Sequence, residues 1–363
     1  MAINYTRPSR CADVIDVLII DDSAVAREVL ASILSQEAGF RVRTAADAVV
    51  AMRMLRRQQP HVIVLDLRMP RMNGLTFLHR LMAREPIPVV VCSSYAASGT
   101  RDALEALQYG AVAIVSKPTL GVQKFLSDSR MELVDAVRSA ASARLHCSRM
   151  RVKHALTKLA RTAPVEMRSG PACERNIVAI GASTGGTEAV RIILEAMPED
   201  APPIIVVQHM PPVFTAAFAH QLDQTCAIEV KEASHGDVLR AGLALIAPGN
   251  QHVRVRRGMT HCSVHLSGRL PESQYCPSID LLFHSVADAV GASATGVILT
   301  GMGVDGVDGL LAMRRRGAAT IAQDEASSAI YSMPRVALER GAVEHPTALS
   351  MIAVTILRRS GYL

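Results

Sequence analysis

Short runs of Val, Ile, Leu and Ala alternate with helical patterns along this chain, and the alternation forms two separate series. The first series occupies residues 16 to about 142, and the second begins at Asn176. Strands that alternate with helices through short connections pack as a parallel sheet with helices on its faces. The sequence therefore predicts two α/β domains, and 363 residues allow each to bury its own core.

The strands can be placed from the apolar runs and from the polar or glycine-rich turns that follow them. In the first series we expect strands at Asp16–Asp22, Phe40–Ala45, His61–Leu67, Pro88–Ser94 and Ala111–Lys117. A helix from Gln123 to about Leu145 closes this series. In the second series we expect strands at Ile177–Ile180, Ile204–Gln208, Ala244–Ala247, Gly296–Thr300 and Thr320–Ala322. The second sheet is expected to be doubly wound and mostly parallel.

Composition sets limits on compartment and chemistry. Aromatic residues make up 3% of the chain and Trp is absent, so both cores must consist mainly of aliphatic side chains. No apolar run approaches the ~20 residues that span a bilayer, and residues 1–16 have no signal-peptide core. The seven cysteines form no C-x-x-C pair and are interpreted as reduced thiols. We expect a cytoplasmic protein without membrane insertion.

The net charge of +6 is concentrated in one segment. Eight Lys or Arg and a single acid, Glu166, lie between Arg138 and Arg168. This stretch is rich in Arg, Ser and Ala and has no sustained core periodicity, so residues 141–173 are interpreted as a basic linker. The flanking domains are close to neutral, and we do not expect nucleic-acid binding.

Carboxylates follow two strands of the first series. Asp21 and Asp22 end the first strand, and Asp66 ends the third. In a sheet of order 2-1-3-4-5 these strands are neighbours, and their carboxyl ends line one crevice. Three acids in one pocket require a cation, and oxygen ligands suit Mg²⁺. Ser93 and Lys117 end the fourth and fifth strands, so the complete set can accept a phosphoryl group on a carboxylate.

These residues resemble the receiver domain of two-component response regulators, over residues 14–140 and with a flavodoxin-like (βα)5 fold. The resemblance implies that Asp66 is the phosphoacceptor and that Asp21, Asp22 and Asp66 hold Mg²⁺. It also implies that Lys117 clamps the phosphoryl group and that Ser93 is the switch hydroxyl.

Two positions depart from the common receiver pattern. Arg68 stands where an acid or a neutral residue is frequent, and this could alter the lifetime of an aspartyl phosphate. Ile114 replaces the usual aromatic residue, which puts a rotamer-based signal at this position in doubt.

The first turn of the second series is "GASTGG", which lies between a predicted strand and a predicted helix. Such a turn either cradles a phosphate or presents a nucleophile, and this one lacks the P-loop lysine and the G-x-G-x-x-G spacing. A nucleophilic Ser183 needs a base and an acid that orients the base. His209 follows the next buried strand, and Asp305 lies in the glycine-rich turn "TGMGVDG". These three residues should converge at the carboxyl edge of one sheet.

Other histidines compete for the role of base. His252 is the main rival, because it also follows an apolar run. In the alternating run "THCSVHL" a metal site is conceivable, but the side chains split between the two faces of a strand. Structural roles are expected for His220, His235 and His284.

Several stretches resemble the catalytic domain of the chemotaxis protein-glutamate methylesterase family. They are "IVAIGASTGGTEA", "VVQHMPPVFTAAFA", "IAPGNQH", "PSIDLLFHSVA", "LTGMGVDGVDGL" and "YSMPRVALERGAV". The resemblance places a catalytic domain at residues 174–363. It implies hydrolysis of glutamate γ-methyl esters on chemoreceptors, with release of methanol, and deamidation of selected receptor glutamines.

On this resemblance Ser183 is the nucleophile, His209 the general base and Asp305 the orienting carboxylate. The backbone N–H of Met302 is a candidate oxyanion donor, and the esterase chemistry requires no cofactor. The implied partners are methyl-accepting chemoreceptors and a chemotaxis histidine kinase, and a monomer is expected. Two rival readings are a phosphorylation-dependent scaffold without activity and a regulator that binds nucleic acid through residues 138–168.

Overall fold

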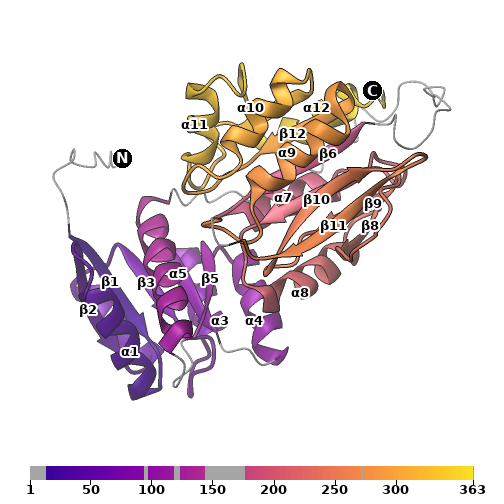
Figure 1. Ribbon diagram of the computed structural model, residues 1–363. Coiled ribbons are helices and arrows are strands. Elements are labelled where there is room, and N and C mark those ends of the chain that lie inside the picture. Colours follow the sequence, from indigo (N-terminus) through magenta and orange to yellow (C-terminus); the bar gives the residue numbers. More distant parts are fainter. Residues whose placement is uncertain (1–13, 94–96, 118–122, 144–175, 271–272, 363) are drawn as a thin grey trace, which may run out of the picture.

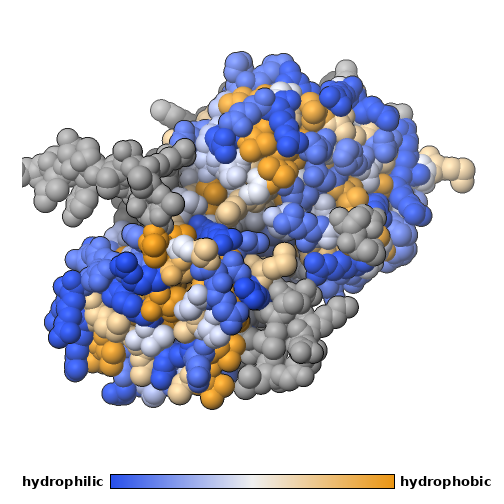
Figure 2. Space-filling model, turned by 60° about the vertical axis from the view of Figure 1, so that its left-hand side comes forward, coloured by the Kyte–Doolittle hydropathy of each residue, from blue (hydrophilic) through white to orange (hydrophobic). Residues whose placement is uncertain are grey.

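The computed structural model describes residues 14–93, 97–117, 123–143, 176–270 and 273–362. The described residues form two α/β domains (Figure 1). This confirms the predicted fold class. In the space-filling view the domains are two lobes whose surfaces mix hydrophilic and hydrophobic residues (Figure 2).

The first domain alternates strands and helices throughout. Its elements are β1 (Ile15–Ile20), α1 (Ala24–Ser35), β2 (Phe40–Ala45), α2 (Ala48–Arg57), β3 (Val62–Leu65), α3 (Gly74–Arg84), β4 (Val89–Ser93), α4 (Ala97–Gln108), β5 (Ala113–Ser116) and α5 (Gln123–Ser142). The strand order is β2-β1-β3-β4-β5, and all neighbouring pairs are parallel. The predicted order is therefore correct, although β1 ends before Asp21 and Asp22.

Local sequence explains where these helices begin. Ser23, Asp47 and Asn73 each precede a helix, and each accepts a hydrogen bond from an N–H of the first turn through its side-chain oxygen. Such caps satisfy donors that have no partner inside the helix. Strands β3 and β4 are buried along their whole length because helices cover both faces of the sheet.

The second domain contains a larger sheet and a separate hairpin. Its elements are β6 (Ile177–Ala182), α7 (Gly186–Glu195), β7 (Ile204–Gln208), α8 (Pro212–Asp223), β8 (Glu229–Glu232), β9 (Leu243–Ile246), β10 (Gln251–Arg257), β11 (Cys262–Gly268), α9 (Ile279–Ala289), η2 (Gly291–Ser293), β12 (Ala294–Ile298), α10 (Val307–Arg315), β13 (Ala319–Gln323), α11 (Met333–Glu339), β14 (Pro346–Thr347) and α12 (Leu349–Arg359).

The seven-stranded sheet has the order β14-β13-β12-β6-β7-β9-β8, with every pair parallel. After β6 the chain first adds β7, β8 and β9 on one side of β6 and later adds β12, β13 and β14 on the other side. The strand order therefore reverses beside β6, and ligands of doubly wound sheets bind at such a position. Strands β8 and β14 were not predicted, because each is short and lacks a long apolar run. Strand β12 begins two residues before the predicted Gly296, and it ends at Ile298, so Thr300 belongs to the turn that follows.

The two domains are in contact beside the turn that follows β6. Helix α4 packs against α7 and α8, where Leu104 and Leu107 of α4 meet Phe218 and Leu222. Val112, just before β5, accepts a backbone hydrogen bond of 3.3 Å from the N–H of Gly185. Figure 1 shows the first domain below the edge of the larger sheet.

Several predictions concern residues that the structure describes only in part. Helix α5 extends to Ser142, so the first two residues of the predicted linker 141–173 are helical, and residues 144–173 lie outside the described chain. Among the described cysteines, Cys92, Cys226, Cys262 and Cys276 are not joined in disulfides. Within the described residues, no helix combines the length and apolar character needed to cross a bilayer.

Candidate active site and receiver pocket

The turn after β6 presents Ser183. Strand β6 is buried over its whole length, and the Ser183 N–H donates a 3.1 Å hydrogen bond to the Thr300 carbonyl. Gly185 adopts φ = 76°, a left-handed conformation that other residues rarely adopt. Gly181 is required for space, since a Cβ there would lie 2.2 Å from a methyl group of Ile279. The glycines therefore allow the chain to turn tightly while α9 packs close beside it.

Three N–H groups of this turn donate to carbonyl groups of the protein. The N–H of Ser183 donates to the Thr300 carbonyl, as described above, and the N–H of Gly185 donates to the Val112 carbonyl. The N–H of Gly186 donates to the Ser183 carbonyl at 2.8 Å. A phosphate cradle needs such N–H groups to point at the ligand. This favours the nucleophile reading of the turn over the phosphate reading.

Ser183, His209 and Asp305 come together at the carboxyl ends of three neighbouring strands. Ser183 follows β6, His209 follows β7 and Asp305 follows β12. The Ser183 Oγ lies 3.2 Å from Nδ1 of His209, and Nε2 of His209 lies 2.9 Å from Oδ2 of Asp305. With a proton on Nε2, the ring donates to the carboxylate and offers Nδ1 as the acceptor for the serine proton.

Asp305 lies at the N-terminus of α9. Its carboxylate accepts hydrogen bonds from the N–H groups of Ile279 at 2.7 Å and Asp280 at 3.1 Å, and from the Ser278 hydroxyl at 3.0 Å. Burial raises the pKa of Asp305, but His209 and the two backbone donors lower it by more, so the net pKa is below the ordinary value. The positive end of the helix also favours a negative charge here. Asp305 is therefore held ionised beside His209.

Tyr275 was not predicted as a site residue, yet its ring stacks on the imidazole of His209. The centroids are 4.6 Å apart and the planes differ by 7°. The hydroxyl of Tyr275 lies close to Gly303, where a Cβ would be 3.1 Å away. Burial raises the pKa of Tyr275, and Asp135 of α5 and Asp305 raise it further. Local sequence carries no signal for this contact, because the stack joins two loops distant in the chain.

The rival base is placed elsewhere. His252 is fully buried, its Nδ1 accepts a hydrogen bond from the N–H of Ser278 at 3.2 Å, and its Nε2 lies 3.3 Å from the backbone nitrogen of Leu270. It holds the segment that carries Tyr275 and does not pair with Ser183. In the run "THCSVHL", Cys262 is buried and His265 lies on the opposite face of β11. In the described part of the chain, no group of three potential metal ligands occurs in this run.

Met302 lies in the turn between β12 and Asp305, next to Ser183. A Cβ at the preceding Gly301 would come within 2.7 Å of the Ser183 Cβ, so this turn approaches the nucleophile closely. The side chain of Met302 is partly exposed, and its sulfur accepts a hydrogen bond of 2.6 Å from the Ser139 hydroxyl of α5. A receiver helix therefore touches the turn that contains the candidate oxyanion donor.

The receiver pocket contains the carboxylates expected from the sequence. Ligand oxygens of Asp21, Asp22 and Asp66 all lie within 4.8 Å of one another. Lys117 Nζ lies 2.7 Å from Oδ2 of Asp21 and 2.8 Å from Oδ2 of Asp66. Ser93, the last residue of β4, is buried near this edge. Three carboxylates exceed the charge of one lysine, so the donor set fits a hard divalent cation.

Burial dominates the electrostatics of Asp66. Burial raises the pKa of Asp66, Lys117 lowers this pKa, and the charge of Asp21 raises it. The net pKa of Asp66 lies above the ordinary value. Burial lowers the pKa of Lys117, but Asp21 and Asp66 raise it by more. The unusual Arg68 donates its backbone N–H to Oδ1 of Asp66 at 3.3 Å. Ile114 is buried inside β5 and contributes to the core.

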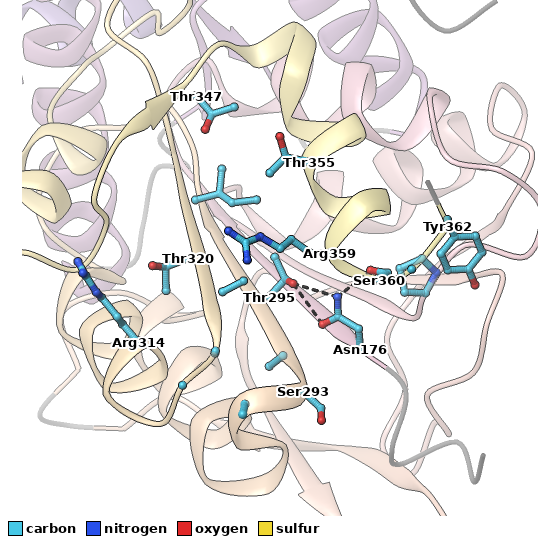
Figure 3. Close-up of a pocket in the computed structure, with 18 of the residues that line it drawn as sticks. Asn176, Ser293, Thr295, Arg314, Thr320, Thr347, Thr355, Arg359, Ser360 and Tyr362 are labelled. Atoms are coloured by element: carbon cyan, nitrogen blue, oxygen red, sulfur yellow. Dashed lines mark hydrogen bonds between the residues drawn. The ribbon is translucent and has the colours of Figure 1, made fainter. Parts of the chain in front are cut away.

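A large hollow occurs at the opposite edge of the seven-stranded sheet (Figure 3). Its volume is about 1150 Å³, and it lies at the amino ends of β6, β12 and β13. Asn176, Thr295 and Ser360 form a hydrogen-bonded cluster in it, and Arg314 pairs with Glu344 on its rim. None of Ser183, His209 and Asp305 lines it, so this hollow is separate from the candidate active site.

The fold and the two sites define a two-domain response regulator whose output domain brings a serine, a histidine and an aspartate together. Residues 17–127 match the family model of the response regulator receiver domain, and residues 178–356 match that of the CheB methylesterase. The chain belongs to the protein-glutamate methylesterase family of response regulators.

Curated relatives extend over nearly the whole chain. A protein-glutamate methylesterase/protein-glutamine glutaminase from Anaeromyxobacter dehalogenans is 50% identical over 344 residues, which cover 94% of this chain and 98% of the relative. A relative of the same description from Geobacter metallireducens is 46% identical, covering 96% of this chain and 99% of the relative.

Proposed function

We propose that this protein is a phosphorylation-regulated hydrolase that demethylates glutamate γ-methyl esters on chemoreceptors and deamidates selected receptor glutamines. The observation that carries the proposal is the continuous contact from Ser183 through His209 to Asp305. The relatives, named protein-glutamate methylesterase/protein-glutamine glutaminase, support both activities and a role in chemotactic adaptation.

In the proposed acylation, Ser183 Oγ attacks the ester carbonyl carbon while Nδ1 of His209 takes the hydroxyl proton. The positive imidazolium is stabilised by Asp305, which already accepts from Nε2. When the tetrahedral intermediate collapses, the C–O bond to the methoxy group breaks, and His209 returns the proton so that methanol leaves. General base assistance of this kind contributes roughly 10²–10⁴-fold.

Deacylation repeats the same proton transfers with water. His209 removes a proton from water, the hydroxide attacks the acyl-enzyme, and Ser183 leaves as the proton returns to it. The product is the free glutamate side chain. With a glutamine substrate the same steps release ammonia in place of methanol, and the N–H of Met302 is the proposed donor to the oxyanion in both reactions.

In the receiver, Asp66 is proposed to attack a phosphoryl group delivered by a chemotaxis histidine kinase. Asp21, Asp22 and Asp66 would hold Mg²⁺, which when bound would offset negative charge on the transferring group. Lys117 is already in place between two of these carboxylates. Ser93 supplies a hydroxyl for the transferred phosphoryl group. The esterase half is proposed to work without a cofactor.

The contacts between the domains support regulation by coverage of the active site. The carbonyl of Val112 in the receiver accepts a hydrogen bond from the turn that carries Ser183. The hydroxyl of Ser139, also in the receiver, donates a hydrogen bond to the sulfur of Met302. A receiver in this position restricts access of a large substrate to the nucleophile. Phosphorylation of Asp66 is proposed to shift the population towards open forms. We further propose a cytoplasmic monomer, with domain limits of 14–140, 141–173 and 174–363.

The deciding experiment measures methanol release from methylated chemoreceptor membranes, with and without a small-molecule phosphodonor and Mg²⁺. Release should rise with the donor and disappear in Ser183→Ala. Release that ignores the donor would refute the proposed role of the receiver. A wild-type protein that releases no methanol under either condition would refute the proposed substrate.

A further inference from the structure

The hairpin β10–β11 has two chemically different faces. One face carries Val253, Val255, Cys262 and Val264, all buried, and it packs against α9. The N–H of Val255 also donates a 2.9 Å hydrogen bond to the Ser285 hydroxyl of α9. Burial of this face anchors the hairpin to the domain, and the polar residues of its strands are directed to the other side.

The opposite face, here named the basic face, consists of Arg254, Arg256, Ser263 and His265. Arg254 stands directly opposite His265 in the antiparallel register, and Arg256 stands opposite Ser263. The ring of His235 meets that of His265 edge-on, with centroids 4.6 Å apart. Neither arginine stands opposite an acidic residue, so the pairing of the two strands supplies no counter-charge for them.

The cations of this hairpin lack the carboxylate partners found elsewhere in the domain. Within the described residues, Arg254, Arg256 and Arg257 form no ion pair. Asp237, on the segment that bonds to β11, is already engaged with Lys231 and with the N–H of Ser234. Cations of this domain that do pair with carboxylates include Arg191, Lys231, Arg240, Arg314, Arg316, Arg335 and Arg340.

Burial lowers the pKa of His265, and Arg256, His235 and Arg254 lower it further. Its Nδ1 atom is buried and has no hydrogen-bond partner. The basic face therefore combines uncompensated charge with an unsatisfied polar atom.

The base of the hairpin is tied to the active site. His252 accepts a hydrogen bond from the Ser278 N–H, and the Ser278 hydroxyl donates to Asp305. A strand advances about 3.3 Å per residue, so Arg254 and Arg256 lie about 7 and 13 Å along the strand from His252.

We propose that the basic face of β10–β11 is a docking surface for an acidic segment of the receptor substrate, close in the receptor chain to the ester that reaches Ser183. The inference rests on the proposed function, because that reaction converts esters on the substrate into glutamate carboxylates. A substrate segment with several such positions is acidic, and its charge complements the unpaired arginines.

The test compares the double variant Arg254→Glu/Arg256→Glu with the control Arg315→Glu/Arg358→Glu, which makes the same charge change at exposed, unpaired arginines of α10 and α12. Each protein is assayed with methylated chemoreceptor membranes and with the small ester N-acetyl-glutamate γ-methyl ester. We expect the hairpin variant to raise KM for the membranes about tenfold at ~50 mM salt, with the effect shrinking at ~500 mM salt. Turnover of the small ester and kcat should stay unchanged, and the control should behave like the wild type.

Equal KM values for both variants would overturn the docking surface while leaving the proposed function intact. If the hairpin variant lost affinity for duplex DNA while its KM for the membranes stayed at the wild-type value, the basic face would be a nucleic-acid binding surface and the inference would be wrong. If the variant lost turnover of the small ester, Arg254→Gln/Arg256→Gln would decide, because it removes charge without adding repulsion. A wild-type protein that hydrolyses the small ester but not the membranes would instead refute the proposed function.

Discussion

Replacing Asp305 with Asn should nearly abolish the proposed esterase activity, for a reason visible in its hydrogen bonds. Oδ2 accepts from Nε2 of His209 at 2.9 Å and from the Ile279 N–H at 2.7 Å. Oδ1 accepts from the Ser278 hydroxyl at 3.0 Å and from the Asp280 N–H at 3.1 Å. Both oxygens thus face donors, whereas an asparagine offers one oxygen and one NH₂ group.

Either orientation of the new amide is unfavourable. With NH₂ towards His209, the ring must accept at Nε2 and carry its proton on Nδ1, so it cannot take the proton of Ser183. With NH₂ towards Asp280, that N–H loses its acceptor, and the imidazolium loses the negative charge that stabilises it. Loss of the correct tautomer or of this charge costs roughly 10³–10⁴-fold in kcat, equivalent to about 4 to 5.5 kcal/mol of activation free energy.

The assay is steady-state methanol release, with Asp308→Asn as the matched control. Asp308 lies three residues further on, is exposed and pairs with Arg340, so its replacement should leave kcat unchanged. KM should change little for Asp305→Asn, because Asp305 is buried behind His209. A loss of less than about tenfold in a folded variant would show that Asp305 neither selects the tautomer nor stabilises the imidazolium.

Three further outcomes are expected. Tyr275→Ala should lower kcat about threefold to tenfold by removing the stack on His209, while Tyr275→Phe keeps activity; equal losses in both would contradict a stacking role. Asp66→Asn should raise stability to urea at pH 7, because it removes a buried carboxylate whose ionised form is disfavoured in the fold. Because the pKa of Asp66 is raised in the folded protein, its ionised form destabilises the fold. The gain in stability should therefore vanish as the pH falls below the ordinary pKa of 3.8. A gain that persists at lower pH would contradict this account. Deleting residues 1–170 should raise basal hydrolysis of a small ester, and unchanged or lower activity in a folded truncation would argue against coverage by the receiver.

The amino-acid sequence by itself determined the class of both domains and the convergence of their chemical groups. Apolar runs and helical patterns have local periods, and they identified the strands that precede Ser183 and His209. Parallel strands end at a common edge, so residues that directly follow neighbouring strands meet there. This rule alone predicted that Asp21, Asp66 and Lys117 lie together, as the structure shows.

Only the tertiary structure decided which atoms face one another. It placed Nδ1 of His209 towards Ser183 and Nε2 towards Asp305, and it brought Asp305 to the N-terminus of α9. It also stacked Tyr275 on His209 and gathered unpaired arginines on one face of β10–β11. These contacts join segments far apart in the chain and depend on loop paths and side-chain packing, for which a local sequence pattern contains no periodic signal.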